Sequence, residues 1–396
     1  MYTVLATATH HPEEINPYSG LWNARSFEAF CKRDVGFNVV SPRPFAPPVG
    51  PYSDYRQIPR VESFDGYDVH RPRFFYGIPK RLFYGTAGNS FAKRVPTYAE
   101  QTFGVPDVIH ACHIYIDGYG FLEYSRDHDI PLFVVAHGSI LNEYDEFTSG
   151  VQAKIRETIS HAEQVLCVSN ALEERATEIV PDAETTLFPI GADPENFPTD
   201  RATELRRENN IPTDEPFVLF CGLFIERKGL EEIMAVLPTL EDETAQVAFV
   251  GHQGELREEL EEAVADAGLE DRVEIHQGLS TDALREYFAM ADLLLLPSHA
   301  EGRPTVIYEA MAAETAVLST TVGGIPEQVV DGETGVLIPP GDVDALRESL
   351  ERLLADRQRV LELGENGHQR LHAEGWTWEA HAERMETLHR AALEDG

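Results

Sequence analysis

Short apolar runs alternate with segments of helical period along almost the whole chain. In the second half, amphipathic stretches such as ELREELEEAVADAG and DALREYFAMA separate the runs VLFCGL, QVAFVG, VEIHQG and DLLLLPS. The first half alternates less regularly, through YTVLATA, FNVVSP, VIHACH, PLFVVAH and QVLCVS. Because strands that alternate with helices assemble into parallel sheets with helices on their faces, the pattern predicts an α/β fold.

The stretch 192–215 is polar and rich in turn-forming residues, so we expect a linker there. The chain has 396 residues, more than one typical core holds, which favours two domains. In doubly wound domains, ligands bind beyond the carboxyl ends of the strands. We therefore expect two Rossmann-like domains that face each other across a cleft, with the ligand in that cleft.

The composition is strongly acidic, with a net charge of −36 and lysine at only five positions. Nucleic acid is an unfavourable partner for such a surface, because phosphate binding needs basic side chains. An acidic surface that is poor in lysine stays hydrated in strong salt. We therefore hypothesise a halophilic source.

The sequence has no run of eighteen apolar residues, and no basic segment precedes its first apolar stretch. We therefore expect no membrane span, and we interpret the start as a first strand and not as a signal peptide. The four cysteines are far apart, and three of them lie in apolar runs. Buried thiols of this kind are typical of a reducing cytoplasm, so we expect a cytoplasmic protein.

Two glutamates, Glu301 and Glu309, enclose seven residues in the segment EGRPTVIYE. Paired carboxylates often catalyse reactions of sugars, but a retaining glycosidase needs them about 5–5.5 Å apart. A helix that begins near Pro304 would separate them by up to about 12 Å. The pair is therefore not interpreted as an acid and a nucleophile. Taken alone, the two residues could be ordinary surface glutamates on either side of a helix start. The first N–H groups of such a helix are free, however, and they suit a diphosphate.

A second loop, Gly222–Gly229, follows the run VLFC and carries Lys228. A cation at the carboxyl end of a strand suits a leaving group that bears phosphate. The alternative is a solvated lysine in a turn, and the spacing does not match a Walker A loop.

Together with further motifs, these two segments resemble the retaining glycosyltransferases of family 4, which have the two-domain GT-B fold. The block EGRPTVIYE followed by GGIPE is the most specific part of the resemblance. The other matching segments are collinear over nearly the whole chain: PYSG (17–20), PDVIHACH (106–113), VVAHGS (134–139), VLCVSNAL (165–172), FPIGADPENF (188–197), CGLFIERKG (221–229), AFVGHQGE (248–255), RVEIHQG (272–278), TTVGGIPEQVVDGETGVLIPPGD (320–342) and WTWE (376–379).

The resemblance implies an N-terminal acceptor-binding domain over residues 1–197 and a C-terminal domain over residues 198–378 that binds the nucleotide sugar. The final helix, 379–396, is expected to pack back onto the N-terminal domain. The chain would then cross between the domains near 195–205 and again near 375, which would permit hinge closure on the donor.

For the site, the resemblance implies that Glu301 binds hydroxyls of the donor sugar and that Glu309 binds the ribose. Lys228 would neutralise the diphosphate, and His113 would face the sugar from the N-terminal domain. The expected catalytic residues are thus His113, Lys228 and Glu301. The other expected donor-binding residues line the cleft, hold the base or cradle the diphosphate: Gly20, His137, Gly222, Gln277, Gly278, Gly302, Arg303, Pro304, Thr305 and Val306. Without the resemblance, both histidines would fit hydrogen-bonded residues at strand ends.

The chain departs from the family pattern beside the strand-end glycine, where Leu223 replaces an arginine that serves as a second diphosphate cation. We hypothesise that Arg303, inside the glutamate block, supplies the missing charge. Glu314 and Ala316 replace a common glycine and proline, and Ile190 replaces an asparagine. None of these three changes removes a group that we assign to the chemistry.

The segment Asp127-His128-Asp129 looks like the metal-binding DxD motif of the other main glycosyltransferase fold. It lies at a predicted helix end, so we interpret it as solvated charge. No other acidic or histidine cluster has metal-ligand spacing. We therefore expect no metal and no cofactor, with the nucleotide sugar as a substrate.

Residues 56–104 differ from the rest of the chain in their charge. This stretch contains eight lysines and arginines and only four acidic residues, which gives a local charge of +4. Aromatic residues alternate with these cations. A basic and aromatic surface can bind anionic lipid or a lipid diphosphate, so we consider peripheral contact with the inner face of the cell membrane. The alternative is an insert that packs its aromatic side chains on the core.

The expected reaction moves a hexose-type sugar, with retention, from a nucleoside-diphosphate sugar to a hydroxyl of a glycan, a lipid-linked sugar or a small molecule. Because the sequence offers no convincing enzyme nucleophile, a front-face mechanism with electrostatic stabilisation of the leaving group is favoured. A nucleotide-sugar epimerase of the same fold and a non-catalytic nucleotide-sugar-binding protein stay open as alternatives. The sequence leaves the base, the sugar and the acceptor undetermined.

Overall fold

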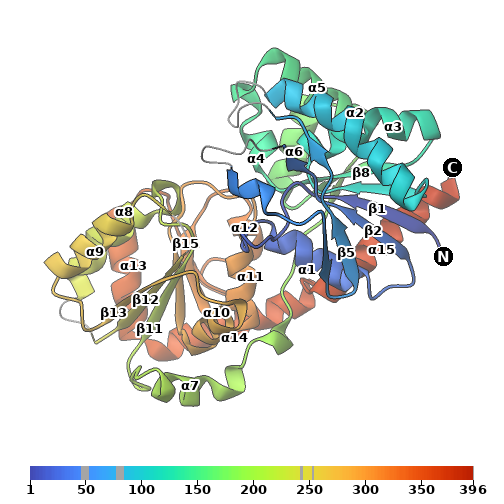
Figure 1. The fold of residues 1–396 in the computed structure, drawn as a ribbon. Coiled ribbons are helices and arrows are strands. Elements are labelled where there is room, and N and C mark those ends of the chain that lie inside the picture. Colours follow the sequence, from blue (N-terminus) through green and yellow to red (C-terminus); the bar gives the residue numbers. More distant parts are fainter. Residues whose placement is uncertain (46–52, 77–83, 241–243, 252–253, 396) are drawn as a thin grey trace. The chain divides into compact units, whose positions relative to one another are not determined.

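The computed structural model describes residues 1–45, 53–76, 84–240, 244–251 and 254–395 (Figure 1). The chain forms two units: residues 1–190 and 378–396 form unit 1, and residues 191–377 form unit 2. Each unit is built around a sheet whose strands are parallel, apart from one strand in unit 1. The predicted α/β fold with two parallel sheets is therefore confirmed.

The sheet of unit 1 has the strand order β10-β9-β8-β7-β1-β2-β5-β4, and β4 is the antiparallel strand. A short parallel ribbon, β3 with β6, follows β2 and β5 along the chain. The strands are β1 Thr3–Thr7, β2 Gly36–Val40, β3 Arg43–Pro44, β4 Val61–Phe64, β5 Tyr67–His70, β6 Arg73–Phe74, β7 Val108–Ala111, β8 Leu132–Ala136, β9 Gln164–Cys167 and β10 Thr185–Leu187.

Helices cover both faces of this sheet, with α2, α3 and α5 together on one side and α1 and α15 on the other (Figure 1). Strands β1, β7 and β8 are almost entirely apolar and buried, as expected for strands that are covered twice. The helices are α1 Leu21–Phe30, α2 Tyr84–Phe103, α3 Tyr119–His128, α4 Ser139–Asn142, α5 Ser149–His161, α6 Asn170–Ile179 and α15 Trp378–Asp395.

The last helix, α15, belongs to unit 1 and is attached to it by buried histidines. His381 Nε2 lies 2.9 Å from Ser26 Oγ of α1, and His389 Nε2 lies 3.2 Å from His110 Nδ1 of β7. Burial lowers the pKa of His381 to about 4 and the pKa of His389 to about 3. Both imidazoles are therefore neutral in the folded chain at neutral pH.

The sheet of unit 2 has the order β13-β12-β11-β14-β15-β16, and every strand pair in it is parallel. Strand β14 is four leucines, all buried. The strands are β11 Phe217–Cys221, β12 Gln246–Gly251, β13 Val273–Gln277, β14 Leu293–Leu296, β15 Ala316–Thr320 and β16 Val336–Ile338. The helices are α7 Ala202–Glu208, α8 Leu230–Val236, α9 Arg257–Asp266, α10 Thr281–Met290, α11 Thr305–Ala312, α12 Ile325–Gln328, α13 Val343–Ala355 and α14 Arg357–Ala373.

The stretch 192–215, which the composition predicts as a linker, is instead part of unit 2 and contains α7. Arg206 on α7 is buried and donates to Met290 O at 2.8 Å and to Asp292 Oδ2 at 2.7 Å. The polar composition of this stretch did not mark a linker. One of its polar side chains, Arg206, is buried in an ion pair with Asp292, the residue before β14.

The basic and aromatic stretch 56–104 divides between core and surface. Phe74 and Phe91 are buried, with ring centroids 5.4 Å apart, whereas Phe75 is 61% exposed. Lys80, Arg81 and Phe83 lie outside the described residues. Packing on the core therefore accounts for some of these aromatic side chains but not for Phe75.

We predict that His389→Phe weakens the acid sensitivity of unfolding. Because His389 is neutral when folded, the unfolded chain binds one more proton below pH 6.5. Stability from this group is present above about pH 6.5 and is lost as the pH falls towards the folded pKa. The loss in unfolding free energy from pH 6.5 to 4.5 should be about 2 kcal/mol smaller in the variant.

Urea titrations of the full chain at both pH values measure this difference. The exposed His128 provides the control, because His128→Phe should leave the pH dependence as in the unchanged chain. An equal pH dependence in His389→Phe would contradict the assignment.

Candidate donor and catalytic site

The candidate site of unit 2 lies where the strand order reverses. Strand β11 pairs with β12 on one side and with β14 on the other, although β12 and β13 lie between β11 and β14 in the chain. Because the strands are parallel, the loops after Cys221 and Leu296 leave the sheet side by side. Such a reversal is where open α/β sheets bind their ligands.

The two loops bring Lys228 and Glu301 into direct contact. Lys228 Nζ lies 2.6 Å from Glu301 Oε1, and Ser298 Oγ donates to the same oxygen at 2.8 Å. The side chains are only 15% and 9% exposed. Gly229 makes the approach possible, since it has a φ of +71° and a Cβ there would lie 2.0 Å from Pro297 O. A cation and a carboxylate are thus held together at the carboxyl end of the sheet.

Glu309, on α11, lies close to the same strand end. Burial raises the pKa of the Cys221 thiol, the Glu309 carboxylate raises it further, and the Lys228 ammonium opposes both. Both charges must therefore lie near Cys221, the last residue of β11. Lys228, Glu301 and Glu309 were predicted separately from the sequence, and the structure brings them to one strand end.

The segment GGIPE, residues 323–327, holds the loop that carries Glu301. Gly324 N–H donates to Gly302 O at 2.7 Å, and a Cβ on Gly323 would lie 2.0 Å from Glu301 O. From the next turn, Gln328 Nε2 donates to Pro304 O at 3.1 Å. The two most specific motifs of the sequence are therefore parts of one structure, in which the second supports the first.

Arg303 is buried within this structure. Its Nη1 lies 3.0 Å from Glu327 Oε2, and its guanidinium lies 4.9 Å from the ring centre of Trp376 and 5.7 Å from that of Tyr308. The side chain is 2% exposed. A guanidinium that is paired and stacked in this way favours a structural role for the side chain. The hypothesis that it replaces the cation missing at Leu223 stays a prediction.

The segment from Gly302 to Val306 leads into α11, which begins at Thr305 after Pro304. Ile307 N–H donates to Pro304 O, so the N–H groups of Thr305 and Val306 precede the first hydrogen bond of the helix. The predicted diphosphate cradle is therefore a helix start that follows the Glu301 loop directly.

The remaining donor-binding candidates of unit 2 end neighbouring strands. Gly222 follows β11, and its N–H donates to Val250 O at 3.0 Å. Gln277 ends β13, two strands away, and its side-chain oxygen accepts from Arg257 Nη1. Gly278 has a φ of +74°, and its N–H donates to Gly251 O at 2.9 Å. Gly222 lies beside Lys228, since a Cβ on it would lie 3.8 Å from the lysine side chain, whereas Gln277 and Gly278 lie two strands farther along the same carboxyl edge.

In unit 1 the strand order reverses at β1, which pairs with both β2 and β7. His113 follows β7, His137 follows β8, and the loop after β1 contains His10 and Gly20. The ring centres of His10 and His113 are 5.0 Å apart, and those of His113 and His137 are 5.3 Å apart. Gly20 has a φ of +67° and a Cβ on it would lie 2.3 Å from His10 O. The structure therefore gathers His113, His137 and Gly20.

Sequence reasoning missed Asp117, a fully buried carboxylate beside His113. Its Oδ2 lies 3.2 Å from His113 Nδ1, and it accepts from Thr9 N–H at 3.0 Å and from Thr9 Oγ1 at 3.0 Å. Because a carboxylate can only accept, Nδ1 of His113 carries the hydrogen. In the neutral ring, Nε2 is then free to accept a hydrogen bond from a ligand. The four-residue spacing of His113 and Asp117 was the one available signal.

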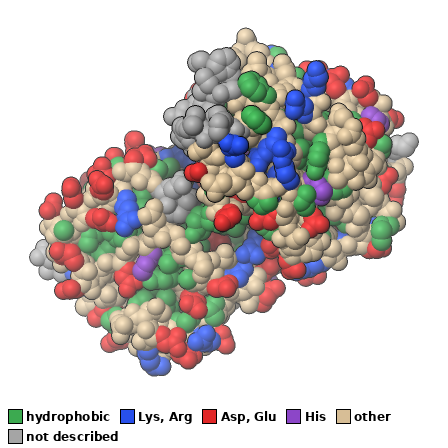
Figure 2. Space-filling view, in the orientation of Figure 1, with side chains coloured by type: hydrophobic (Ala, Val, Ile, Leu, Met, Phe, Trp, Pro, Cys, Tyr) green, Lys and Arg blue, Asp and Glu red, His purple; other side chains and the backbone are tan. Residues whose placement is uncertain are grey.

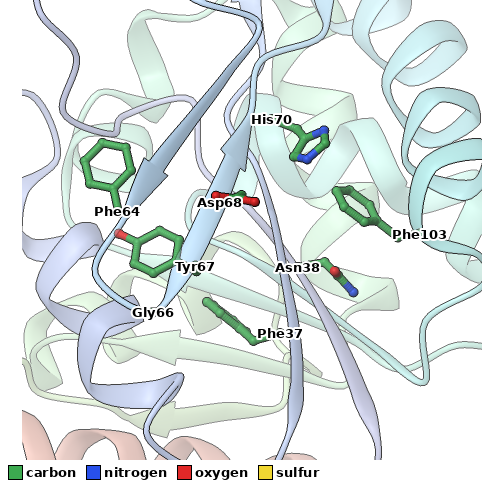
Figure 3. Close-up of a pocket in the computed structure, with 8 residues that line it drawn as sticks. All are labelled: Phe37, Asn38, Phe64, Gly66, Tyr67, Asp68, His70 and Phe103. Carbon is green, nitrogen blue, oxygen red and sulfur yellow. The ribbon is translucent and has the colours of Figure 1, made fainter.

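A separate pocket of about 480 Å³ lies along β2 and β5, from Phe37 near the start of β2 to His70 at the end of β5 (Figure 3). The residues that line it do not include His10, His113 or His137, and we give it no role in donor binding. It is lined by Phe37, Asn38, Phe64, Gly66, Tyr67, Asp68, His70 and Phe103.

Among the described residues, no group of three histidine, cysteine or acidic side chains is placed to hold a metal ion. Asp127, His128 and Asp129 are exposed at the end of α3, as predicted for solvated charge. In the same part of the chain, no helix is both long and apolar enough to cross a membrane.

Two parallel α/β sheets, each with polar groups gathered where its strand order reverses, define the architecture of a GT-B glycosyltransferase. Residues 28–196 match a family model described as "Glycosyltransferase Family 4", and residues 201–370 match one described as "Glycosyl transferases group 1". The chain belongs to this family of glycosyltransferases. As a member it is a hexosyltransferase that takes its sugar from a nucleotide sugar.

Similar proteins cover most of the chain. The chain is 28% identical to the putative teichuronic acid biosynthesis glycosyltransferase TuaC of Bacillus subtilis, over 88% of each chain. It is 30% identical to the D-inositol 3-phosphate glycosyltransferase of Xylanimonas cellulosilytica, over 76% of this chain and 74% of that one. The solved structure of sucrose-phosphate synthase from Thermosynechococcus elongatus matches the whole length of both chains, with a TM-score of 0.82 and 23% identity. This last likeness shows the fold.

We predict that Arg303→Met lowers the stability of the chain and changes its affinity for the donor less than about threefold. The reason is that the guanidinium already neutralises Glu327, so its removal leaves a largely buried carboxylate without that partner. Breaking a buried pair from one side costs about 3–5 kcal/mol. Thermal unfolding and calorimetric titration with the nucleoside diphosphate measure the two effects.

Arg347→Met breaks an exposed pair with Asp344 and serves as the control, with an expected cost of about 1 kcal/mol or less. If Arg303→Met kept its stability and lost most of its affinity for the diphosphate, Arg303 would be the replacement cation after all.

Proposed function

We propose that the chain transfers a hexose-type sugar, with retention of configuration, from a nucleoside-diphosphate sugar to a hydroxyl of a glycan, a lipid-linked sugar or a small molecule. The observation that carries the proposal is the contact between Lys228 and Glu301 where the strand order of unit 2 reverses. In this proposal unit 2 binds the donor, and unit 1 holds the acceptor.

The diphosphate lies between Lys228 and the first N–H groups of α11. There the lysine and the partial positive charge of the helix start stabilise the charge that develops as the bond to the sugar breaks. In the structure, Glu301 lies 2.6 Å from Lys228 and neutralises it. Donor binding replaces part of this contact, and Glu301 then accepts hydrogen bonds from hydroxyls of the sugar.

The other proposed contacts complete the donor. Glu309 binds the ribose from α11, and Gln277 with Gly278 holds the base at the end of β13. Gly20, Gly222 and the segment 302–306 leave room for the phosphates or donate to them. The support is their common position at carboxyl ends of strands, where parallel sheets bind ligands.

His113 acts from unit 1, and Asp117 fixes the ring. With Nδ1–H bound to Asp117, Nε2 accepts a hydrogen bond from a hydroxyl of the donor sugar and so orients the sugar. The acceptor hydroxyl attacks the anomeric carbon on the face that the diphosphate leaves, and its proton passes to the departing diphosphate oxygen. His137 shapes the same corner, and burial lowers the pKa of His137 well below its usual value, so that it adds no charge. No metal takes part in this proposal.

We predict that Lys228→Met and Glu301→Gln each lower kcat/KM about 100-fold or more, because both act on the transition state in a site with little water. A thermal-shift screen of nucleoside-diphosphate sugars identifies the donor, and release of the nucleoside diphosphate measures the rate. Glu226→Gln is the matched control, since Glu226 is exposed on the same loop and should behave as the unchanged chain.

Product analysis separates the alternatives in the same experiment. An altered sugar released without any acceptor would assign an epimerase, and donor binding without turnover would assign a binding protein. A trapped covalent glycosyl-enzyme would replace the front-face mechanism by a double displacement.

We predict that Asp117→Asn lowers kcat about tenfold or more while KM for the donor changes little. The amide can donate to Nδ1 and so favours the other tautomer of His113. Nitrogen-15 spectra of the imidazole report the tautomer directly, with or without turnover. If the variant loses activity while the His113 tautomer stays unchanged, Asp117 does not act through the ring.

A further inference from the structure

Phe45 and Phe75 are an exposed aromatic pair on unit 1. They are 65% and 61% exposed, more than any other large apolar side chain of the described residues except Met1. Strand β3 pairs with β6 in the register Arg43 with Arg73 and Pro44 with Phe74, and Phe45 N–H donates to Phe74 O at 2.8 Å. Phe45 and Phe75 therefore stand next to each other at the end of the ribbon.

The ribbon beneath this pair is firmly attached. Phe74 points to the other side, where it is buried against Phe91 of α2. Phe75 N–H donates to Ser90 Oγ, also on α2, at 2.8 Å. The two exposed rings are thus held on a fixed scaffold, and fixed apolar surface of this kind marks an interaction site.

The charges around the ribbon are positive, in a chain whose net charge is −36. Arg43 and Arg71 are buried and form ion pairs with Glu13 and Glu62. Arg71 N–H donates to Arg60 O at 2.7 Å, and β6 begins two residues later at Arg73, so Arg60 lies beside the ribbon. Burial lowers the pKa of Arg73, and the positive charge of Arg60 lowers it further, in agreement with this placement.

Arg60 is exposed, and Arg73 is partly exposed. Figure 2 shows lysine and arginine side chains beside hydrophobic ones on the visible face of unit 1, whereas acidic side chains outnumber basic ones on the visible face of unit 2. The exposed aromatic pair thus adjoins cations that the internal ion pairs do not neutralise.

We propose that Phe45, Phe75, Arg60 and Arg73 form a docking surface for a membrane that contains anionic lipid. Aromatic rings enter the interface between headgroups and acyl chains, while arginines bind the negative headgroups. The net charge of the chain is −36 and repels such a membrane, so a locally basic face is the part that would approach it. Stable binding needs both signals together, and the ribbon supplies both.

Three of the four residues of this surface lie in the stretch 56–104 that the sequence suggested, but the surface is only a part of that stretch together with Phe45. Phe74 and Phe91, which lie in that stretch, are buried, and Phe45 lies outside it. The ribbon follows β2 and β5 beyond their carboxyl ends, the edge of the sheet where His113 also lies. Docking there goes beyond the proposed function and does not depend on the donor chemistry, but it suits an acceptor that is linked to lipid.

Co-sedimentation of the full chain with vesicles tests the proposal. Vesicles of phosphatidylcholine alone are compared with vesicles that contain one third phosphatidylglycerol, at low and at high salt. We expect binding to the anionic vesicles that weakens as salt rises, and little binding to phosphatidylcholine alone.

Phe45→Ser with Phe75→Ser should lower the partition coefficient at least about tenfold, because two rings no longer enter the interface. Arg60→Gln should lower it about fivefold at low salt. Val105→Ser is the control for the rings, since Val105 is 54% exposed elsewhere on unit 1. Lys32→Gln is the control for the charge. Thermal unfolding verifies that each variant folds, and the response to nucleoside-diphosphate sugars should not change.

Three results would overturn the proposal. The first is that the anionic vesicles do not retain the unchanged chain. The second is that the double phenylalanine variant binds these vesicles as well as the unchanged chain does. The third is that sedimentation shows a dimer of the unchanged chain that the double variant does not form, which would assign the surface to contact between copies of the chain. Loss of donor turnover in the Lys228 and Glu301 variants is independent of all three, so failure of one proposal leaves the other testable.

Discussion

The pairing of β11 with β14 is the constraint on which the candidate donor site depends. These strands are separated in the chain by β12 and β13, yet they lie side by side in the sheet. Parallel strands send their following loops out at the same edge, so the residues after Cys221 and after Leu296 must meet. Lys228 and Glu301, distant in the sequence, therefore come within 2.6 Å of each other. In unit 1, the pairing of β1 with β7 has the same effect on His10 and His113.

Two glycines convert this proximity into contact. Gly229 packs against Pro297 O and Gly323 packs against Glu301 O, each at a distance that no Cβ could occupy. Both have positive φ, which other residues adopt only with strain. The ion pair they permit is largely out of water, where desolvation of two charges offsets much of their attraction. Such a pair is poor evidence for stability, but it keeps both charges in place until a ligand that carries phosphate and hydroxyl groups replaces it.

The sequence predicted what depends on local pattern and left out what depends on contact. Alternating apolar runs were sufficient for the α/β fold, and strand ends pointed to Lys228 and to the loop of Glu301, whereas His113 came from the family resemblance. The partners of these residues come from distant segments: Asp117 joins His113 to Thr9, and Glu327 joins GGIPE to Arg303. Pattern alone does not state which face a side chain takes, so Phe74 and Phe75 were indistinguishable although one is buried and the other exposed. The prediction of a linker at 192–215 was wrong for the same reason. The sequence does not show that Arg206 is buried against Asp292, a residue far along the chain.

Asp117 and Glu301 follow the same principle of construction on different sheets. Each carboxylate follows one strand and binds a group that follows the neighbouring strand at the reversal: Asp117 after β7 accepts from Thr9 after β1, and Glu301 after β14 binds Lys228 after β11. A hydrogen-bonded carboxylate in this position fixes two loops with one side chain, and it does so where water is largely excluded, which strengthens each bond. The difference lies in exposure. Asp117 is fully buried, and its hydrogen bonds go to Thr9 and His113, so it can only orient the groups around it. The Glu301 side chain keeps 9% of its surface exposed and can exchange a protein partner for a ligand. That difference is the physical basis for placing Glu301 in contact with the substrate and Asp117 behind His113.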